Sequence, residues 1–179
     1  MTPESDEIPR AVLLQRIERA EQSGDQLLAA DQAAQALERF PDDTAFRYHH
    51  LLSLARAGAL TEAEKLWPRY ALPLDDVNHA ALGARLLRER AFRAGDERRE
   101  LLALAAAAYA RIFRRSGDSF PGINAAVLSA LAGELGAAQA LARQVLAATA
   151  AGHGDRDARF HRAADRLQAA LILGDGAGA

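Results

Sequence analysis

Hydrophobic and polar positions follow one another along this chain with a helical period, in runs that short glycine turns interrupt. An amphipathic run of about 14 residues or more precedes each of the turn glycines Gly24, Gly58, Gly95, Gly133 and Gly174. An alanine-rich run follows each of the first four. Glycine suits the residue just after a helix, where φ is positive and a Cβ is unfavourable. The pattern therefore predicts four units of helix, turn and helix, followed by a last helix.

The turns set the expected bounds of the helices. We expect the first helices of the four units near residues 9–22, 44–57, 76–93 and 119–132. We expect the second helices near residues 26–40, 60–70, 97–115 and 135–150, and the last helix near 157–173. Trp67–Pro68 is expected to end or kink the helix near 60–70, because proline disfavours helical geometry in the residue before it.

Acidic residues after the turns are candidates for helix N-termini, where a carboxylate can accept hydrogen bonds from the free backbone N–H groups. Asp25, Asp96 and Glu134 follow turn glycines directly. Asp43 or Thr44 takes the same place at the start of the second unit.

The last helix is expected to cap the array with one dry face and one wet face. The expected dry face comprises Phe160, Ala163, Ala164, Leu167, Ala170 and Leu171. The expected wet positions are Asp157, Arg159, Arg162, Asp165, Arg166 and Gln168.

The composition supports an all-α fold and excludes several classes of function. Half of the 179 residues are apolar but only 6% are aromatic, and most of the apolar residues are alanine and leucine, which lose little freedom in a helix. A net charge of −2 gives no basic footprint for nucleic acid. The absence of cysteine excludes disulfides and thiolate metal sites. No signal peptide or membrane-length apolar run is present, so we expect a cytoplasmic protein.

The repeat length points to a specific architecture. Gly24 and Gly58 are 34 residues apart, which is the length of a tetratricopeptide repeat of two helices. We therefore predict a tetratricopeptide-like α-solenoid of four helix-turn-helix units with a C-terminal capping helix. The expected organisation is a flexible N-terminus at residues 1–8, a single domain over 9–174 and a flexible tail at 175–179.

Four segments carry a family resemblance: "LLSLARAGALTEAEKLWPRYAL" (51–72), "ALGARLLRERAF" (81–92), "AAAAYARIFRRSGDSFPGINAAVLSALAGELGAAQALARQVL" (105–146) and "LILGD" (171–175). In this order they resemble the tetratricopeptide-like TRAF-binding domain of the apoptosis signal-regulating MAP kinase kinase kinases. Bacterial relatives of that domain precede effectors such as nucleotide cyclase domains. No effector domain follows in this sequence, so the resemblance implies a protein-interaction module rather than the activity that such a module controls.

Equivalent positions relative to the turn glycines give a candidate binding surface. Nine, five and two residues before each glycine, one face of each first helix reads Gln15, Arg19, Gln22; His49, Ser53, Arg56; Leu86, Arg90, Arg93; and Asn124, Leu128, Leu131. Stacking of the repeats would bring these rows onto the concave side. The predicted partner-binding residues are Arg19, His49, Arg56, Arg90 and Asn124. Arginines suit acidic ligands, although a merely solvated face has the same pattern.

The segment "PGIN" (121–124) has two interpretations. In the first, Pro121 lies in the first helical turn, Gly122 admits the preceding helix with Tyr109 and Phe113, and Asn124 bonds a backbone group. In the second, Gly122 and Asn124 shape the floor of a peptide-binding groove.

The sequence therefore predicts a non-catalytic interaction or scaffold module whose partner is another protein or peptide, with an acidic one as a candidate. The alternative is the regulatory segment of a split signalling enzyme whose cyclase or kinase is on another chain. No pattern predicts a catalytic residue, a cofactor or a metal site, and neither nucleic acid nor membrane is an expected partner.

Overall fold

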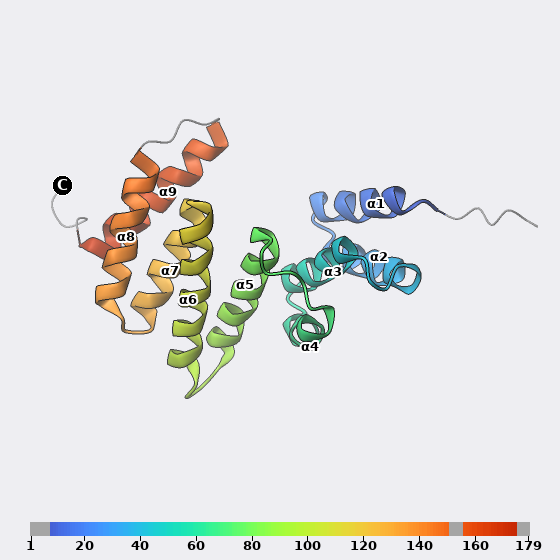
Figure 1. Ribbon diagram of the computed structural model, residues 1–179, viewed down its shortest axis with the longest axis horizontal. Helices are drawn as coiled ribbons and strands as arrows, with labels where there is room; N and C mark the ends of the chain where they lie inside the picture. Colours follow the sequence, from blue (N-terminus) through green and yellow to red (C-terminus); the bar gives the residue numbers. More distant parts are fainter. Residues whose placement is uncertain (1–7, 151–155, 175–179) are drawn as a thin grey trace, which may run out of the picture. The chain divides into compact units, whose positions relative to one another are not determined.

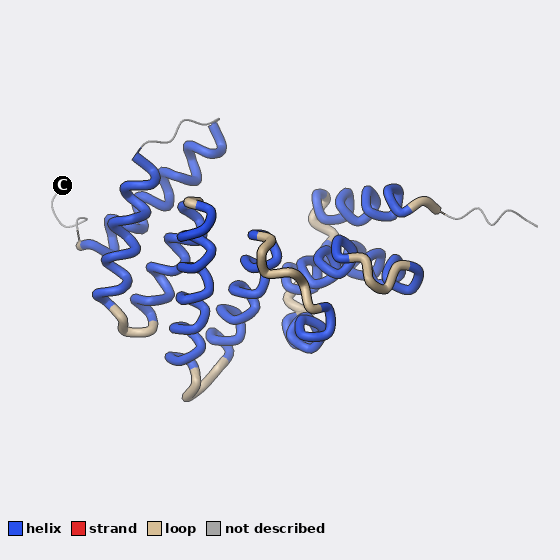
Figure 2. Tube along the Cα trace, in the orientation of Figure 1, coloured by secondary structure: helices blue, strands red, loops and turns tan. Residues whose placement is uncertain are grey.

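The computed structural model describes residues 8–150 and 156–174, and within these ranges the chain forms nine α-helices and no strand (Figures 1 and 2). The helices are α1 (Arg10–Gln22), α2 (Gln26–Arg39), α3 (Thr44–Arg56), α4 (Leu60–Tyr70), α5 (Val77–Arg93), α6 (Arg98–Ser116), α7 (Ser119–Leu131), α8 (Leu135–Ala150) and α9 (Arg156–Leu173). They pack in sequential pairs, as a tetratricopeptide-like array does. The predicted fold class is confirmed.

The chain divides into two compact units, Met1–Pro73 with helices α1 to α4 and Leu74–Ala179 with helices α5 to α9. The single solenoid domain over residues 9–174 stays a prediction, because stacked repeats can form more than one compact unit within one array. The predicted tail at 175–179, and the predicted N-terminal segment except Ile8, lie outside the described residues.

Aspartates start four of the helices. The side chains of Asp25, Asp43, Asp76 and Asp118 accept hydrogen bonds from backbone N–H groups in the first turns of α2, α3, α5 and α7. Asp25 and Asp43 therefore cap helices as predicted. Asp96 does not, because α6 begins one residue later, after Glu97, whose side chain makes no cap bond.

The turns between paired helices differ in one place. Gly24, Gly58 and Gly133 have the expected positive φ, between 80° and 83°. Gly95 lies in the predicted turn, but its φ is not positive, and α5 ends instead at an extended Ala94 with ψ 149°. The α5–α6 connection therefore has a different backbone conformation from the other three.

Helix α4 ends near residue 70 as predicted, but Trp67–Pro68, which was expected to end or kink it, does not end it. The helix continues past Pro68 to Tyr70, and Ala71 then takes a left-handed φ of 46°. Proline removes one backbone donor, and the helix ends within three residues of it. The stop therefore comes from the left-handed residue after the helix rather than from the residue before the proline.

Small side chains build the core of the first unit. Buried residues of α1, α2 and α3 meet in one cluster: Ile17, Ala20, Ala29, Ala33, Ala36 and Phe46. Because alanine adds only a methyl group, the helix axes can approach closely where alanines face one another. The packing joins α1 to α2, α2 to α3 and α3 to α4.

Helix α6 is central to the second unit, where it packs against both α5 and α7. Leu102, Tyr109 and Leu128 are among the largest buried side chains of this cluster. A second cluster joins α6, α7, α8 and α9 through Phe113, Val145 and Ala169, among others. Two adjoining clusters thus hold the five helices of this unit together.

Helix α9 packs on α7 and α8 as a terminal helix should, but through a different face from the predicted one. Leu167 and Leu171 are 64% and 62% exposed, whereas Ala169 and Asp165 are 0% and 7% exposed. The hydroxyl of Ser119 donates a 2.6 Å hydrogen bond to Asp165, which gives the buried carboxylate a partner. The predicted dry face is therefore wrong, and the side chain of Phe160 lies outside those described.

Candidate functional site

The predicted binding residues divide between the two compact units. Arg19 on α1 and both His49 and Arg56 on α3 belong to the first unit. Arg90 on α5 and Asn124 on α7 belong to the second. A single surface made by all five stays a prediction.

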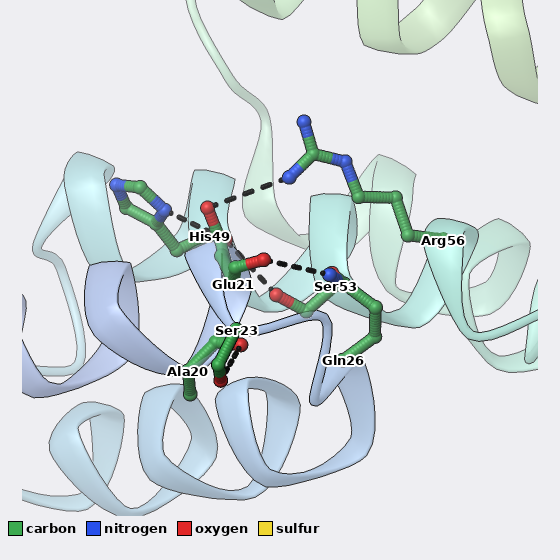
Figure 3. Close-up of polar contacts among 7 residues, drawn as sticks. All are labelled: Ala20, Glu21, Ser23, Gln26, His49, Ser53 and Arg56. Atoms are coloured by element: carbon green, nitrogen blue, oxygen red, sulfur yellow. Dashed lines mark hydrogen bonds and ion pairs between the residues drawn. The ribbon is translucent and has the colours of Figure 1, made fainter.

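In the first unit, His49 and Arg56 meet at the carboxylate of Glu21 (Figure 3). His49 Nδ1 lies 2.9 Å from Glu21 Oε1, and Arg56 Nη1 lies 3.6 Å from Glu21 Oε2. The hydroxyl of Ser53 donates a 3.0 Å bond to Oε1. These three partners are four and seven residues apart on α3, so they share one face of that helix.

The local fold holds Glu21 in place. Glu21 is in the last turn of α1, and Gln26 Nε2 donates a 3.1 Å bond to its backbone carbonyl. The hydroxyl of Ser23 donates a 2.9 Å bond to the carbonyl of Ala20, and the positive φ of Gly24 then reverses the chain (Figure 3). The carboxylate therefore projects from a well-bonded helix end toward α3.

Glu21 and its partners His49, Ser53 and Arg56 form what we call the Glu21 cluster. Its members differ in how far they are exposed. The side chains of Glu21 and His49 are only 10% and 15% exposed, and Ser53 is buried. Arg56 keeps 41% of its side chain exposed. Glu21, His49 and Ser53 thus form an internal polar contact between α1 and α3, and Arg56 is the member that a partner can reach.

The Glu21 carboxyl is stabilised in its ionised form. Burial raises its pKa, but the hydrogen bond and charge interaction with His49, the bond from Ser53 and the charge of Arg56 together outweigh burial, and the net pKa is lowered. A carboxylate therefore already faces two of the side chains that were predicted to bind an acidic partner. Arg19 is exposed on α1, two residues before Glu21.

In the second unit, Asn124 bonds to Arg88, a residue that the sequence did not single out. Arg88 Nη1 donates a 3.3 Å bond to Asn124 Oδ1, and Arg88 Nη2 lies 2.6 Å from Glu89 Oε1. Asn124 Nδ2 also donates a 2.8 Å bond to the carbonyl of Phe120, as the structural interpretation of this asparagine predicted. Arg90 is 57% exposed, 3.9 Å from Glu97.

The glycine alignment explains which residues were missed. It pairs Asn124 with Leu86, which is 4% exposed and buried in the core. The residue that contacts Asn124 is instead Arg88, two residues further along α5. The predicted binding face of the first helices is also less exposed to solvent than expected, because Ser53 and Leu128 on it are buried. Glu21 lies one residue off the predicted face, and no local signal in α1 singles it out.

Gly122 has the packing role that the first interpretation assigned to it. It is buried on α7, and a Cβ built on it would lie 2.7 Å from Val145 Cγ2 and 3.0 Å from the ring of Phe113. Phe113 of the preceding helix and Val145 of the following one therefore both reach this backbone. A buried residue in such contact is not available as the floor of an open groove.

Two further observations concern the described part of the chain. Within residues 8–150 and 156–174, no group of three or more histidine, aspartate or glutamate side chains is arranged to hold a metal ion. Among the helices described there, none has the length and apolar character needed to cross a membrane.

Comparison with known proteins gives one match. A search of curated proteins and a search of solved structures found no significant match to the chain. Residues 13–129, from α1 to α7, match the family described as Tetratricopeptide Repeats-Sensor. This match covers well over half of the chain and includes both turn-linked helix pairs of the first unit. The chain therefore belongs to the tetratricopeptide repeats-sensor family.

Proposed function

We propose that this protein is a non-catalytic interaction module that recognises another protein or peptide. The family carries this proposal, because tetratricopeptide repeats typically bind proteins. The stacking of helix pairs in such arrays creates extended surfaces without any need for a reaction centre.

The exposed arginines are the contacts that we assign to the partner. Arg19, Arg56 and Arg90 are all exposed on first helices of the pairs. A guanidinium can form two parallel hydrogen bonds with a carboxylate, so an acidic segment suits them. His49 and Asn124 have a supporting role in this proposal, because each already makes internal hydrogen bonds.

A specific observation also favours the regulatory alternative, in which the module controls a cyclase or kinase on another chain. The matched family is described as a sensor, and the segments between residues 51 and 175 resemble the TRAF-binding domain of signalling kinases. The link to those kinases is part of the proposal.

One experiment tests both forms of the proposal. The wild type and Arg56→Gln/Arg90→Gln are used as bait, and captured proteins are identified by mass spectrometry. The control is Arg111→Gln/Arg114→Gln, which removes two charges from exposed positions of α6. We expect one partner to be captured by the wild type and the control but lost with the first variant. Equal capture by all three baits would contradict the arginine surface, and a cyclase or kinase as that partner would favour the regulatory form.

A further inference from the structure

A hollow lies between two turns of the second unit, at the ends of the helices. It has a volume of about 440 Å³, which is within the range of ligand pockets in proteins. The α5–α6 turn, the start of α6 and the α7–α8 turn line it, with Gly95, Asp96, Arg98, Arg99, Leu102, Leu131, Ala132 and Gly133. The first-helix residues Arg90 and Asn124 do not line this hollow.

Arg99 is oriented before any ligand arrives. Its Nε donates a 2.9 Å hydrogen bond to the carbonyl of Ala132 on the opposite wall. A Cβ built on Gly133 would lie 3.7 Å from Arg99 Nη2, so the guanidinium reaches the glycine of the α7–α8 turn. The bond to Ala132 uses one of the five N–H donors of the guanidinium, and the remaining donors can serve a ligand.

Arg98 is the second cation of the hollow, and an aromatic ring supports it. Its guanidinium carbon lies 5.8 Å from the centroid of the Phe92 ring, which is a cation–π distance. Phe92 is 44% exposed, so this pair stands at the surface. Contact with a ring face restricts the plane of the guanidinium and reduces the entropy that it loses on binding an anion.

The charge and apolar surface of the lining indicate the ligand. Two arginines and Asp96 give the lining a net charge of +1, which suits a singly charged carboxylate better than a doubly charged phosphate. Leu131 contributes an apolar surface that is 51% exposed, and the buried Leu102 lies beneath. A carboxylate that is next to an apolar side chain matches both features.

We propose that this hollow binds the carboxylate of an acidic peptide segment whose neighbouring apolar side chain covers Leu131. The site rests on the interaction function proposed above and supplies that module with a second contact, which lies on α6 and the turns rather than on the first helices. Arg98 and Arg99 bind the carboxylate, and the bond to Ala132 positions Arg99.

The test is a titration of the ¹⁵N-labelled full chain with acetyl-Leu-Glu-amide, followed by nuclear magnetic resonance. We expect saturable shifts of the Gly95 and Gly133 amide signals. Arg98→Gln and Arg99→Gln should each weaken binding about fivefold, which is the upper end for an exposed ion pair. Arg111→Gln, on an exposed position of the same helix, should bind as the wild type does. If Arg99→Gln disturbs the turn, Arg98→Gln still tests the site.

Three results would overturn the proposal. The first is equal binding of acetyl-Leu-Gln-amide, which lacks the charge. The second is equal binding of inorganic phosphate, which would make the hollow a general anion site. The third is a shift pattern that Arg98→Gln leaves unchanged. Because the peptide replaces the natural partner, these outcomes are independent of the capture experiment with Arg56 and Arg90, and either hypothesis can fail alone.

Discussion

At the scale of single residues, Gly122 is the position where the structure leaves least room. Gly122→Ala would place a methyl group 2.7 Å from Val145 Cγ2, so Val145 or the backbone around it must shift. We expect a loss of about 1–3 kcal/mol in the free energy of unfolding, as for other overpacked cores. The control is Gly136→Ala in α8, where a Cβ meets nothing within 4 Å and the added methyl should be neutral or stabilising by up to about 1 kcal/mol. Equal unfolding midpoints in denaturant would refute the packing role.

Glu21 is a mostly buried charged residue of the first unit with three side-chain partners. Its pKa in the folded protein is below the usual 4.5, so its contribution to stability is fully present above pH 4.5 and is lost as the pH falls through the folded value. We expect Glu21→Gln to cost about 1–3 kcal/mol at neutral pH, since it removes a charged acceptor of several bonds. Below about pH 4 the difference in the free energy of unfolding between the variant and the wild type should become smaller.

Urea unfolding at a series of pH values measures this difference. Glu38→Gln on the exposed side of α2 is the matched control and should follow the wild type throughout. The difference in the free energy of unfolding between Glu21→Gln and the wild type could instead stay constant from neutral to acidic pH. That result would show that the shape of the side chain, and not its charge, explains the effect.

At the scale of elements, substitutions in α9 can show which face of this terminal helix is buried. Leu171→Gln should change stability by less than about 0.5 kcal/mol, because that side chain is 62% exposed. Ala169→Leu should cost about 1–3 kcal/mol, because it adds three carbons at a fully buried position. Thermal melts of the two variants give the comparison, and the reverse order would restore the face that the hydrophobic pattern predicts.

Helix bounds were predictable because caps, glycine turns and periodicity are local signals. Asp25 and Asp43 accept hydrogen bonds from residues within the next turn, so these helix caps can be recognised from the neighbouring residues in the sequence. The buried face of α9 was not predictable in this way, since two apolar stripes compete on it and Ser119 on α7, 46 residues away, helps to decide. The Arg88–Asn124 contact joins residues 36 positions apart on α5 and α7, so no local pattern in the sequence reveals it.

At the scale of the whole molecule, each compact unit has its own core. The two clusters of the second unit lie wholly within Leu74–Ala179. We therefore expect a fragment of residues 74–179 to keep its helical circular dichroism and to unfold cooperatively, as parts of repeat arrays can. A fragment that is unfolded at room temperature would show that the first unit is required for the second. The sequence indicated Arg56 of the candidate site, but not its partner Glu21, which lies on α1.

The alanines of the core have a consequence for how this sequence can diverge. Several are completely buried: Ala29, Ala33, Ala63, Ala91, Ala105, Ala125, Ala126, Ala138, Ala142 and Ala169. At such positions a larger side chain forces the helices apart, whereas large apolar residues exchange for one another at lower cost. Homologues can therefore change most of their leucines and surface charges and still keep the spacing of their small residues. That spacing, more than any motif of large or charged residues, is the signature by which remote relatives of this chain can be recognised.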